Sequence, residues 1–415
     1  MRSTHNSYTP KTKMKTFLLF TLLSTLITSQ KAVVSGTVTD QSGQPLAQAS
    51  IVVKGTHVSV VTNDDGFFTL KVDELPQTVV ISHVGYKTRH VQLTASQTAP
   101  LRVRLQPATI QLSEVVVWRS DPYELVDIAI SKIPENYSRV PELYNCFYRE
   151  TAMKRKHYIY VAEGVLDMYK TAYNNSSMRD RVAIRKGRRL LSQKQSDTLG
   201  IKVNGGPVQP IQLDLVKNLD FLLNKEELSC YDMKMEMPEV INNRTQYVVS
   251  LSPREVKPYA LYFGKLYIDR ETLAFTRAEL SLDMSNREKA TRLMLVKKPL
   301  GVRFRPKELS CLIDYRYVDG VTHISYIRNT FRFNCDWKKR LFATSFTACC
   351  EMVVTDKSPT ADRPLSGRTS FDSHEAFYDR VDYFLDPHFW EDYNIIEPSE
   401  SLDRAIDKLV KRRKK

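Results

Sequence analysis

Metal chemistry is suggested most directly by His388 and Glu391, which have the HxxE spacing of two zinc ligands. A catalytic zinc site needs three protein ligands and an open position for water. The residues that follow, 392 to 415, contain no His or Cys. A second pair, His374 and Glu375, lacks the second histidine of an HExxH motif, and no GxSxG, P-loop or GxGxxG motif occurs. We therefore expect no bound metal, no cofactor and no catalytic residues of a zinc peptidase.

Two glutamates on neighbouring candidate strands offer a different chemistry. Glu150 and Glu163 could act as the paired carboxylates of a hydrolase if their side chains faced each other. Buried ion pairs with Arg149 or Lys154 are the interpretation that we favour, because no third feature of a hydrolase accompanies the carboxylates. Four tyrosines in this region could line a sugar or lipid site, although such cross-strand aromatics more commonly pack on one another. They are Tyr158, Tyr160, Tyr169 and Tyr173.

The cysteines form no metal-binding or redox spacing such as CxxC. They are Cys146, Cys230, Cys311, Cys335, Cys349 and Cys350. An exported chain permits disulfides. Cys311 and Cys335 nevertheless lie on apolar candidate strands, so we favour buried thiols over bridges. Cys349 and Cys350 are adjacent on one strand and point to opposite faces, so at most one of them reaches the core.

Residues 1–30 have the pattern of a secretory signal. Basic residues precede an apolar run at 17–27, which is too short for a transmembrane helix of about 20 residues. We expect cleavage near residue 30 and a precursor that starts at Met1 or Met14. No cysteine follows the run, so a lipoprotein-type lipid anchor is not expected. The protein should reach the periplasm or the periplasmic face of the outer membrane.

The net charge is +14, and much of it is concentrated at the two ends. Residues 1–30 contribute +4 and residues 411–415 contribute +5. An exported protein does not meet nucleic acid, so we expect none as a partner. A further basic run could join the C-terminal tail in contacting anionic lipid or polysaccharide, but a solvated loop is the interpretation that we favour. Its residues are Arg185, Lys186, Arg188 and Arg189.

Turn residues define an N-terminal domain over residues 31–117. They interrupt short runs of Val, Ile, Thr and Phe at intervals that are typical of an all-β sandwich. Gly43 and Gly66 stand where a hairpin turn requires a positive φ, which glycine adopts at little cost. The expected turn positions are Gly36, Gly43, Gly55, Asn63, Asp64, Asp65, Gly66 and Gly85.

This segment, over residues 33 to 117, resembles the carboxypeptidase-like regulatory domain family, a transthyretin-like sandwich of envelope proteins from Bacteroidetes-type bacteria. The matching motifs are GTVTD at 36–40, GQPL at 43–46, ASIVVKG at 49–55, TNDDGFF at 62–68 and VGY at 84–86. The resemblance implies a passive docking or stability module. Such domains accompany zinc carboxypeptidases without catalysing the reaction, and they precede TonB-dependent receptors. Residues 112–117 resemble the linker that leads into those receptors.

Beyond a linker at 118–120, residues 121–398 are expected to form a large curved antiparallel sheet with covering helices. Asp121 and Pro122 mark the start of one helix, which should end at Pro134, and apolar residues at 211–223 suggest a second. Alternation along 309–318 predicts one covered face and one wetter face. The expected strands are 145–152, 157–169, 246–252, 261–269, 274–283, 290–297, 307–318, 321–334 and 341–355. This architecture alone resembles the half-barrel of periplasmic lipoprotein carriers.

Residues 399–415 predict a short amphipathic C-terminal helix with a basic end. Leu402, Ile406 and Leu409 mark the apolar stripe by which it should dock. The segment before it, residues 386–398, resembles the ending of Bacteroidetes envelope proteins that carry the same N-terminal module.

Together these features predict a mainly β protein, in which a seven-stranded sandwich is followed by a curved antiparallel sheet. The expected function is that of an exported, non-enzymatic envelope protein, with the sheet as a scaffold or a binder of a hydrophobic ligand. A hydrolase with its active site in the sheet domain and a carrier of lipid or lipoprotein remain as alternatives. A polar cleft with paired carboxylates or histidine would favour the hydrolase, an apolar cavity the carrier, and a filled core the scaffold. Partners would be an envelope protein, a lipid or a glycan.

Overall fold

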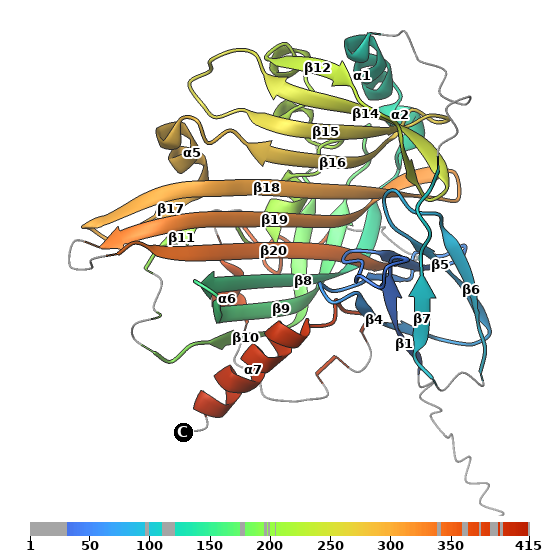
Figure 1. Cartoon of the computed structure of the whole chain (residues 1–415), viewed down its shortest axis with the longest axis horizontal. Coiled ribbons are helices and arrows are strands. Elements are labelled where there is room, and N and C mark those ends of the chain that lie inside the picture. The colour runs from blue at the N-terminus through green and yellow to red at the C-terminus, as the bar shows by residue number, and fades with distance from the viewer. Residues whose placement is uncertain are drawn as a thin grey trace, which may run out of the picture. The chain divides into compact units, whose positions relative to one another are not determined.

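Runs of β-branched and aromatic residues form the strands of this chain, which build a small sandwich and one large sheet (Figure 1). The computed structural model describes residues 31–95, 99–109, 121–174, 179–194, 197, 200–203, 205–337, 342–358, 364–372, 375–381, 389–390 and 393–413. The predicted export signal, the segment at 112–117, the linker at 118–120, and His374, His388 and Glu391 lie outside these residues.

The N-terminal domain is the expected sandwich of seven strands. Its two sheets have the orders β4-β1-β7 and β3-β2-β5-β6, and only β1 and β7 run parallel. Val38, Ile51 and Phe68 are at most 1% exposed and belong to a core that the two sheets share. The strands are β1 (Ala32–Thr39), β2 (Ser50–Val53), β3 (Ser59–Val61), β4 (Phe67–Val72), β5 (Gln77–Ser82), β6 (Arg89–Leu93) and β7 (Leu101–Arg104).

Most of the predicted turn glycines have a positive φ, with values of 84° at Gly43, 74° at Gly55, 73° at Gly66 and 77° at Gly85. The turn around Asn63 is organised by its side-chain oxygen, which accepts hydrogen bonds from the backbone N–H groups of residues 65 and 67. The prediction of a turn is wrong for Gly36, which lies inside β1. A Cβ at this position would lie 2.7 Å from the Cβ of Leu101, so the close approach of β7 requires a glycine there.

The second part of the chain is one antiparallel sheet of eleven strands. Its order is β10-β9-β8-β20-β19-β18-β16-β15-β14-β12, with β13 paired to β14. Strands β18 and β19 pair along 17 residues each and form the middle of the sheet. The strands are β8 (Glu142–Lys154), β9 (His157–Lys170), β10 (Arg181–Leu191), β12 (Tyr231–Met235), β13 (Glu239–Ile241), β14 (Arg244–Pro253), β15 (Tyr262–Asp269), β16 (Phe275–Leu282), β18 (Val302–Val318), β19 (Val321–Trp337) and β20 (Thr344–Lys357). A separate pair is formed by β11 (Lys202–Val203) and β17 (Leu295–Lys297).

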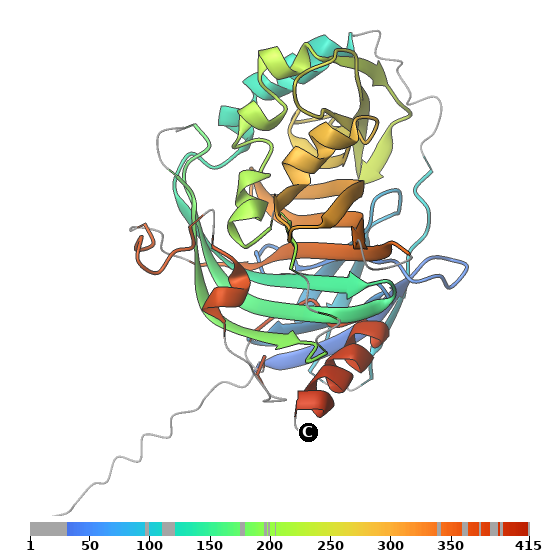
Figure 2. The same ribbon diagram turned by 90° about the vertical axis from the view of Figure 1, so that its left-hand side faces the viewer.

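Helices cover one face of this sheet, as Figure 2 shows, and we call it the inner face. Asp121 caps α1 by accepting a hydrogen bond from the backbone N–H of Tyr123, as its position before Pro122 predicts. The packed core between sheet and helices includes Val126 of α1, Ile211 of α3 and Met294 of α5. The helices are α1 (Pro122–Ser131), α2 (Ile133–Asn136), α3 (Val208–Gln212), a 3₁₀ helix (Leu219–Phe221), α4 (Lys225–Leu228), α5 (Arg287–Met294), α6 (Phe377–Arg380) and α7 (Glu400–Arg413).

Three local predictions are wrong. Residues 290–297 are expected as a strand, but only 295–297 form one, β17, while 290–294 belong to α5, which Asn286 caps through the backbone N–H groups of residues 288 and 289. The helix that begins at Pro122 ends at Ser131, and Pro134 lies in the first turn of α2 instead of terminating α1. Residues 211–223 form two short helical turns rather than one helix, although Leu215 and Leu222 are buried in the core as expected.

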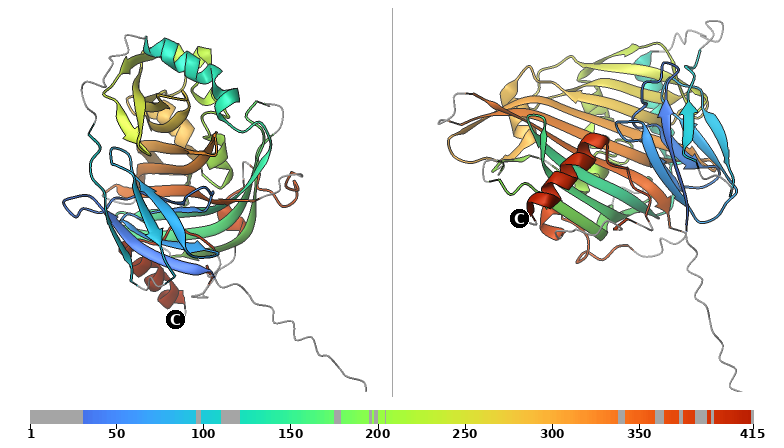
Figure 3. Two further views of the ribbon diagram at one scale, coloured as in Figure 1. Left: turned by 90° about the vertical axis from the view of Figure 1, so that its right-hand side faces the viewer. Right: turned by 60° about the horizontal axis from the view of Figure 1, so that its bottom comes forward.

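The sandwich and the C-terminal segment pack on the other, outer face of the sheet (Figure 3). Val61 of β3 shares an apolar cluster with Tyr326 and Val353 of the sheet and with Trp390 and Ile396 of the C-terminal segment. The Ser59 hydroxyl donates a hydrogen bond of 2.8 Å to the Val354 carbonyl. The sandwich therefore has its own core and also a buried contact with the sheet.

Candidate functional site

Glu150 and Glu163 do not form a carboxylate pair. In the register of β8 and β9, Arg149 is opposite Glu163 while Glu150 is opposite Ala162, so the two glutamates lie on opposite faces of the sheet. Glu150 accepts hydrogen bonds from the hydroxyls of Tyr148 and Tyr160, at 2.6 and 3.0 Å, and burial raises its pKa. The two glutamates therefore do not form the paired carboxylates of a hydrolase.

Glu163 instead has the ion pair that we favoured. Its carboxylate accepts a hydrogen bond of 2.8 Å from Arg149 and one of 2.7 Å from Arg188. Burial alone would raise the pKa of Glu163, but the two guanidinium groups hold it below its usual value. Lys154, the other expected partner, pairs with Asp197 at 3.0 Å.

The four tyrosines do not form one cluster. Tyr158 packs with the apolar side of α7, whereas Tyr160 and Tyr173 pack against the inner core. The Tyr173 hydroxyl donates a hydrogen bond of 2.8 Å to Asp214. Packing and local hydrogen bonds therefore account for Tyr158, Tyr160 and Tyr173, and Tyr169 is 2% exposed. All six cysteines are free thiols, and Cys349 is less buried than its neighbour Cys350.

The basic run at 185–189 is not a solvated loop. It lies in strand β10, where Arg185 pairs with Asp167. Lys186 lies over the ring of Phe389 at 4.3 Å, and Arg188 lies over the ring of Trp390 at 5.3 Å. Arg189 lies 3.9 Å from the ring centre of Tyr378. Aromatic side chains from the C-terminal part of the chain satisfy these cations, which are therefore poorly placed for an anionic partner.

A different set of cations surrounds a cleft of about 1250 Å³ beside α7, which we call the basic cleft. The tight turn between β8 and β9, with Arg155 at a φ of 57°, forms one wall. The side of α7 that carries Arg404 and Lys408 forms another, one helical turn apart. Its lining residues are Met153, Lys154, Arg155, Lys156, His157, Tyr158, Ile159, Lys194, Asp197, Phe342, Thr344, Ser401, Arg404, Ala405, Lys408 and Leu409.

Charge in the basic cleft is strongly unbalanced, since six lysines and arginines line it against one acid, Asp197. Burial would raise the pKa of Asp197, but hydrogen bonds from Ser192 and Lys154 lower it below its usual value. One carboxylate thus faces six cationic side chains, and its direct ion pair is with Lys154. Lys156, Lys194 and Lys408 are exposed, and their charges add to one positive field over the cleft.

Two apolar residues of the basic cleft are already packed in the interior. Ile159 is 3% exposed and belongs to the core on the inner face of the sheet. Leu409 is 4% exposed and belongs to the cluster by which α7 packs on Val161 of β9 and Leu190 of β10. Phe342 is 80% exposed. The cleft therefore combines a cationic rim with one exposed aromatic ring.

A second polar cluster lies in the interior where strands β8, β19 and β20 meet the sandwich. Glu142 accepts hydrogen bonds from Tyr144 and Lys357, and it lies 3.1 Å from Nδ1 of His323. The ring of His57, from the β2–β3 hairpin, is 4.9 Å from that of His323. Although these groups could exchange protons, Glu142, Tyr144 and His323 are at most 5% exposed, so a substrate has no access to them.

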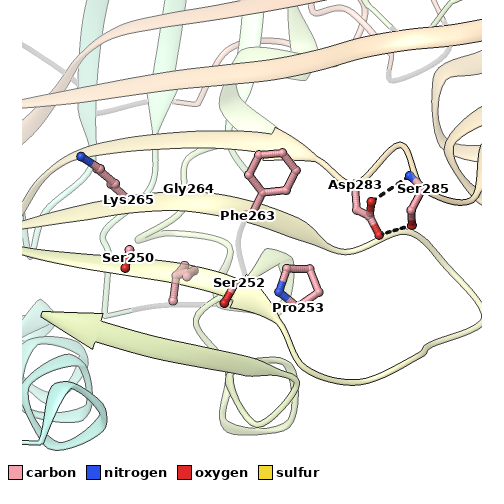
Figure 4. A pocket seen from close by; sticks show the side chains of 9 residues that line it. Ser250, Ser252, Pro253, Phe263, Gly264, Lys265, Asp283 and Ser285 are labelled. Atoms are coloured by element: carbon pink, nitrogen blue, oxygen red, sulfur yellow. Dashed lines mark hydrogen bonds between the residues drawn. The ribbon is translucent and has the colours of Figure 1, made fainter. Parts of the chain in front are cut away.

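Another surface hollow offers less chemistry. Figure 4 shows the depression between β14 and β15, where Asp283 is engaged by the backbone and hydroxyl of Ser285. Lys265 lies at the other end of it. Among the described residues, no group of three His, Cys, Asp or Glu side chains is arranged to hold a metal ion. No helix in the described part of the chain is long and apolar enough to cross a membrane.

Comparison with solved structures gives only distant similarity. A DUF1329 family protein from Desulfovibrio piger is 13% identical, with 60% of this chain and 96% of that protein covered and a TM-score of 0.25. A putative outer membrane lipoprotein-sorting protein domain from Vibrio parahaemolyticus is 9% identical. The similarity covers 60% of this chain and 94% of that chain, with a TM-score of 0.26.

The N-terminal domain gives a clearer result. It is similar to part of the TonB-dependent receptor SusC of Bacteroides thetaiotaomicron, at 35% identity over 89 residues. That match covers 21% of this chain and only 8% of the receptor. A family model for the CarboxypepD_reg-like domain matches residues 34–117, which are the seven strands of the sandwich and the segment after them. Residues 34–117 of this chain are therefore a CarboxypepD_reg-like domain, the family that the turn motifs predicted.

Proposed function

We propose that this chain is an exported, non-enzymatic envelope protein that docks on an anionic lipid surface through the basic cleft. The observation that carries this proposal is the set of six cationic side chains around one cleft with a single, already paired acid. Each lysine or arginine near an anionic membrane surface contributes about 1 kcal/mol to binding. The protein would therefore be peripheral, at the periplasm or the periplasmic face of the outer membrane.

A lipid fits the basic cleft better than a glycan does. Phe342, which is 80% exposed, adds an apolar aromatic ring at the basic cleft. A phosphorylated headgroup would meet the cationic rim while the upper part of its acyl chains met this ring. A polysaccharide would use the charges and leave the apolar surface unused. Because Leu402 and Leu409 already pack on the sheet, α7 would contact the lipid by its charged side rather than insert its apolar stripe.

A scaffold role for the rest of the chain is supported by its packing. The inner face of the sheet and its helices share one continuous cluster of buried apolar residues. A carrier would need an apolar cavity in this place to hold an acyl chain. The sandwich would stabilise the assembly, since Asn394 bonds both backbone groups of Lys71, at 2.7 and 3.0 Å.

The proposal is tested by sedimenting the protein with vesicles. The cleft variant is the triple substitution Lys156→Glu, Lys194→Glu and Lys408→Glu. We expect the wild type to bind vesicles that contain phosphatidylglycerol and not vesicles of phosphatidylcholine alone. The cleft variant should bind at least about 100-fold more weakly, since each lost lysine removes about 1 kcal/mol.

A matched control carries the same change of charge elsewhere, through Lys54→Glu, Lys87→Glu and Lys234→Glu, which are all exposed. It should bind nearly as well as the wild type, apart from the general loss of net charge. Equal loss in both triple variants would show that net charge, rather than the cleft, attracts the vesicle. Binding to a soluble anionic polysaccharide but not to the vesicles would exclude the lipid as the partner.

A further inference from the structure

A small, partly open chamber lies between the sandwich and the outer face of the sheet. It has a volume of about 60 Å³. The sandwich contributes Gln48, Ser50 and Ser82, and the sheet contributes Asp314 and Arg316 of β18 with neighbouring residues of β16 and β19. At 10–15 Å³ for each water-sized sphere, this volume holds about four oxygen-sized atoms. The basic cleft is built from other residues, so the two sites are distinct.

Arg316 is the residue of the chamber that lacks a partner. Its neighbour on the same face, Asp314, is already engaged by Arg277 at 2.9 Å, and Arg277 also bonds Glu279. In the described part of the chain, the guanidinium of Arg316 makes no hydrogen bond or ion pair. Burial lowers the pKa of Arg316 to about 10, and Asp314 only partly opposes that effect. Arg316 is only partly exposed, so a guanidinium in this place is favoured when an anion accompanies it.

Hydroxyl groups complete the surroundings. Ser50 and Ser82 are cross-strand neighbours in the sandwich, and no hydrogen bond to either hydroxyl exists within the described residues. Both can donate to an oxygen atom. The Ser325 hydroxyl is already used, because it donates to the Asp314 carbonyl at 3.0 Å. Both nearby carboxylates, Asp314 and Glu279, are engaged by Arg277, so Arg316 is the arginine of the chamber without an ion pair among the described residues. Burial lowers the pKa of His83, so this ring adds no charge at neutral pH.

We propose that this chamber binds one small oxyanion of the sulfate or phosphate type, with Arg316 as its counter-charge. The guanidinium offers two parallel donors from the sheet, which match two oxygens of such an anion. Ser50 and Ser82 offer further donors from the sandwich. The bound anion would bridge the two domains, so it would stabilise the sandwich in its place on the sheet by mass action.

The test is the melting temperature of the purified full chain, measured against increasing sodium sulfate or sodium phosphate at constant ionic strength made up with sodium chloride. The wild type should be stabilised in a saturable manner. Arg316→Gln should bind sulfate at least about tenfold more weakly, because it loses charge-assisted hydrogen bonds. Arg303→Gln is the matched control, since Arg303 is exposed on the same strand, and it should respond like the wild type.

A further variant, Arg316→Met, separates the anion site from a folding defect. In buffer that contains only chloride it should be at least as stable as the wild type, because it removes an unpaired charge. A strongly destabilised Arg316→Met in that buffer would show that the protein itself satisfies the guanidinium and would overturn the proposal. An equal response to sulfate in the wild type and Arg316→Gln would also overturn it. If acetate stabilises the protein in a saturable manner while sulfate and phosphate do not, the site binds a carboxylate and the proposal of a tetrahedral anion is overturned.

Discussion

Removal of Arg149 should be among the most destabilising single changes in this protein. The side chain is 4% exposed and lies between Glu163, 1% exposed, and Glu351. One of its Nη groups also donates to the backbone carbonyl of Ile396. Arg149 therefore connects β8 and β9 with the C-terminal segment through one desolvated guanidinium. Replacement of Arg149 by an apolar residue would leave the buried carboxylate of Glu163 with fewer hydrogen-bond donors.

We expect Arg149→Met to lower the free energy of unfolding by about 3 kcal/mol. Breaking a buried ion pair costs about 3–5 kcal/mol, and Arg188 continues to hold one oxygen of Glu163, which places the loss at the lower end. The native pKa of Glu163 is below its usual 4.5, so its contribution is complete above pH 4.5 and is lost as the pH falls through the native pKa. The difference in free energy of unfolding between Arg149→Met and the wild type should therefore become smaller below pH 4.5.

Urea denaturation at pH 7 and at lower pH measures these differences. The double variant Arg149→Met, Glu163→Leu should recover much of the loss, because it removes the stranded charge as well as its partner. Arg185→Met is the control: it breaks the more exposed pair with Asp167 and should change stability by less than about 1 kcal/mol. The reasoning would be refuted by a single variant within 1 kcal/mol of the wild type, or by a double variant no more stable than Arg149→Met.

Three further outcomes are expected. Burial, then the charges of His323 and Lys357, lower the pKa of His57 to about 4, so stability should fall between pH 6.5 and 4 as the unfolded chain alone takes up the proton. The variant His57→Asn should lose less stability than the wild type over this pH range. The difference should be smaller than about 3 kcal/mol, because the ring is partly exposed. Thermal melts of both proteins at pH 6.5 and at pH 4 measure it. Gly66→Ala should lower the melting temperature more than Gly43→Ala: both residues have a positive φ, but only at Gly66 would a Cβ lie 2.5 Å from a carbonyl oxygen. The unfolded protein, without reductant, should react with six equivalents of a thiol reagent, and fewer would indicate a disulfide.

The sandwich could be predicted because its signals are local. Gly43, Gly55 and Gly66 each mark a backbone conformation with positive φ that a neighbouring residue can hardly adopt. Regular alternation between these turns then fixes which side chains face the core. Gly36 was misplaced because its requirement comes from β7, which pairs with β1 from a distance of more than sixty residues.

Long-range contacts explain what the sequence could not predict in the sheet. Strand β10 carries cations at positions where a strand is expected to be apolar, and the aromatic partners Phe389 and Trp390 lie two hundred residues away. The faces of Glu150 and Glu163 depend on the turn between β8 and β9 and on a bulge near Ala152. For α5 a local signal did exist: Asn286 followed by Glu288 is typical of a helix start.

For the basic cleft, too, the sequence shows the local features but not the long-range contacts that bring them together. The run from Lys154 to His157 is visible in the sequence as a basic turn between two strands, and Arg404 and Lys408 are visible as neighbours on a helix. That the turn and the helix form one site follows only from the packing of α7 on β9 and β10. The charged tail drew attention to residues 411–415, whereas the cations that line a cleft lie earlier in the helix.

The position of α7 also explains how the sandwich can matter for a site that it does not line. The Asn63 side chain donates a hydrogen bond of 3.0 Å to the carbonyl of Pro398, and Asp65 accepts one of 2.6 Å from the backbone N–H of Glu400. These two residues of the β3–β4 turn thus fix the start of α7, and Ser401 and Arg404 of the basic cleft follow within one turn. A carboxylate at a helix N-terminus is favoured by the exposed N–H groups and the helix dipole. The turn that is typical of the domain family therefore aligns the helical wall of the basic cleft with its strand wall.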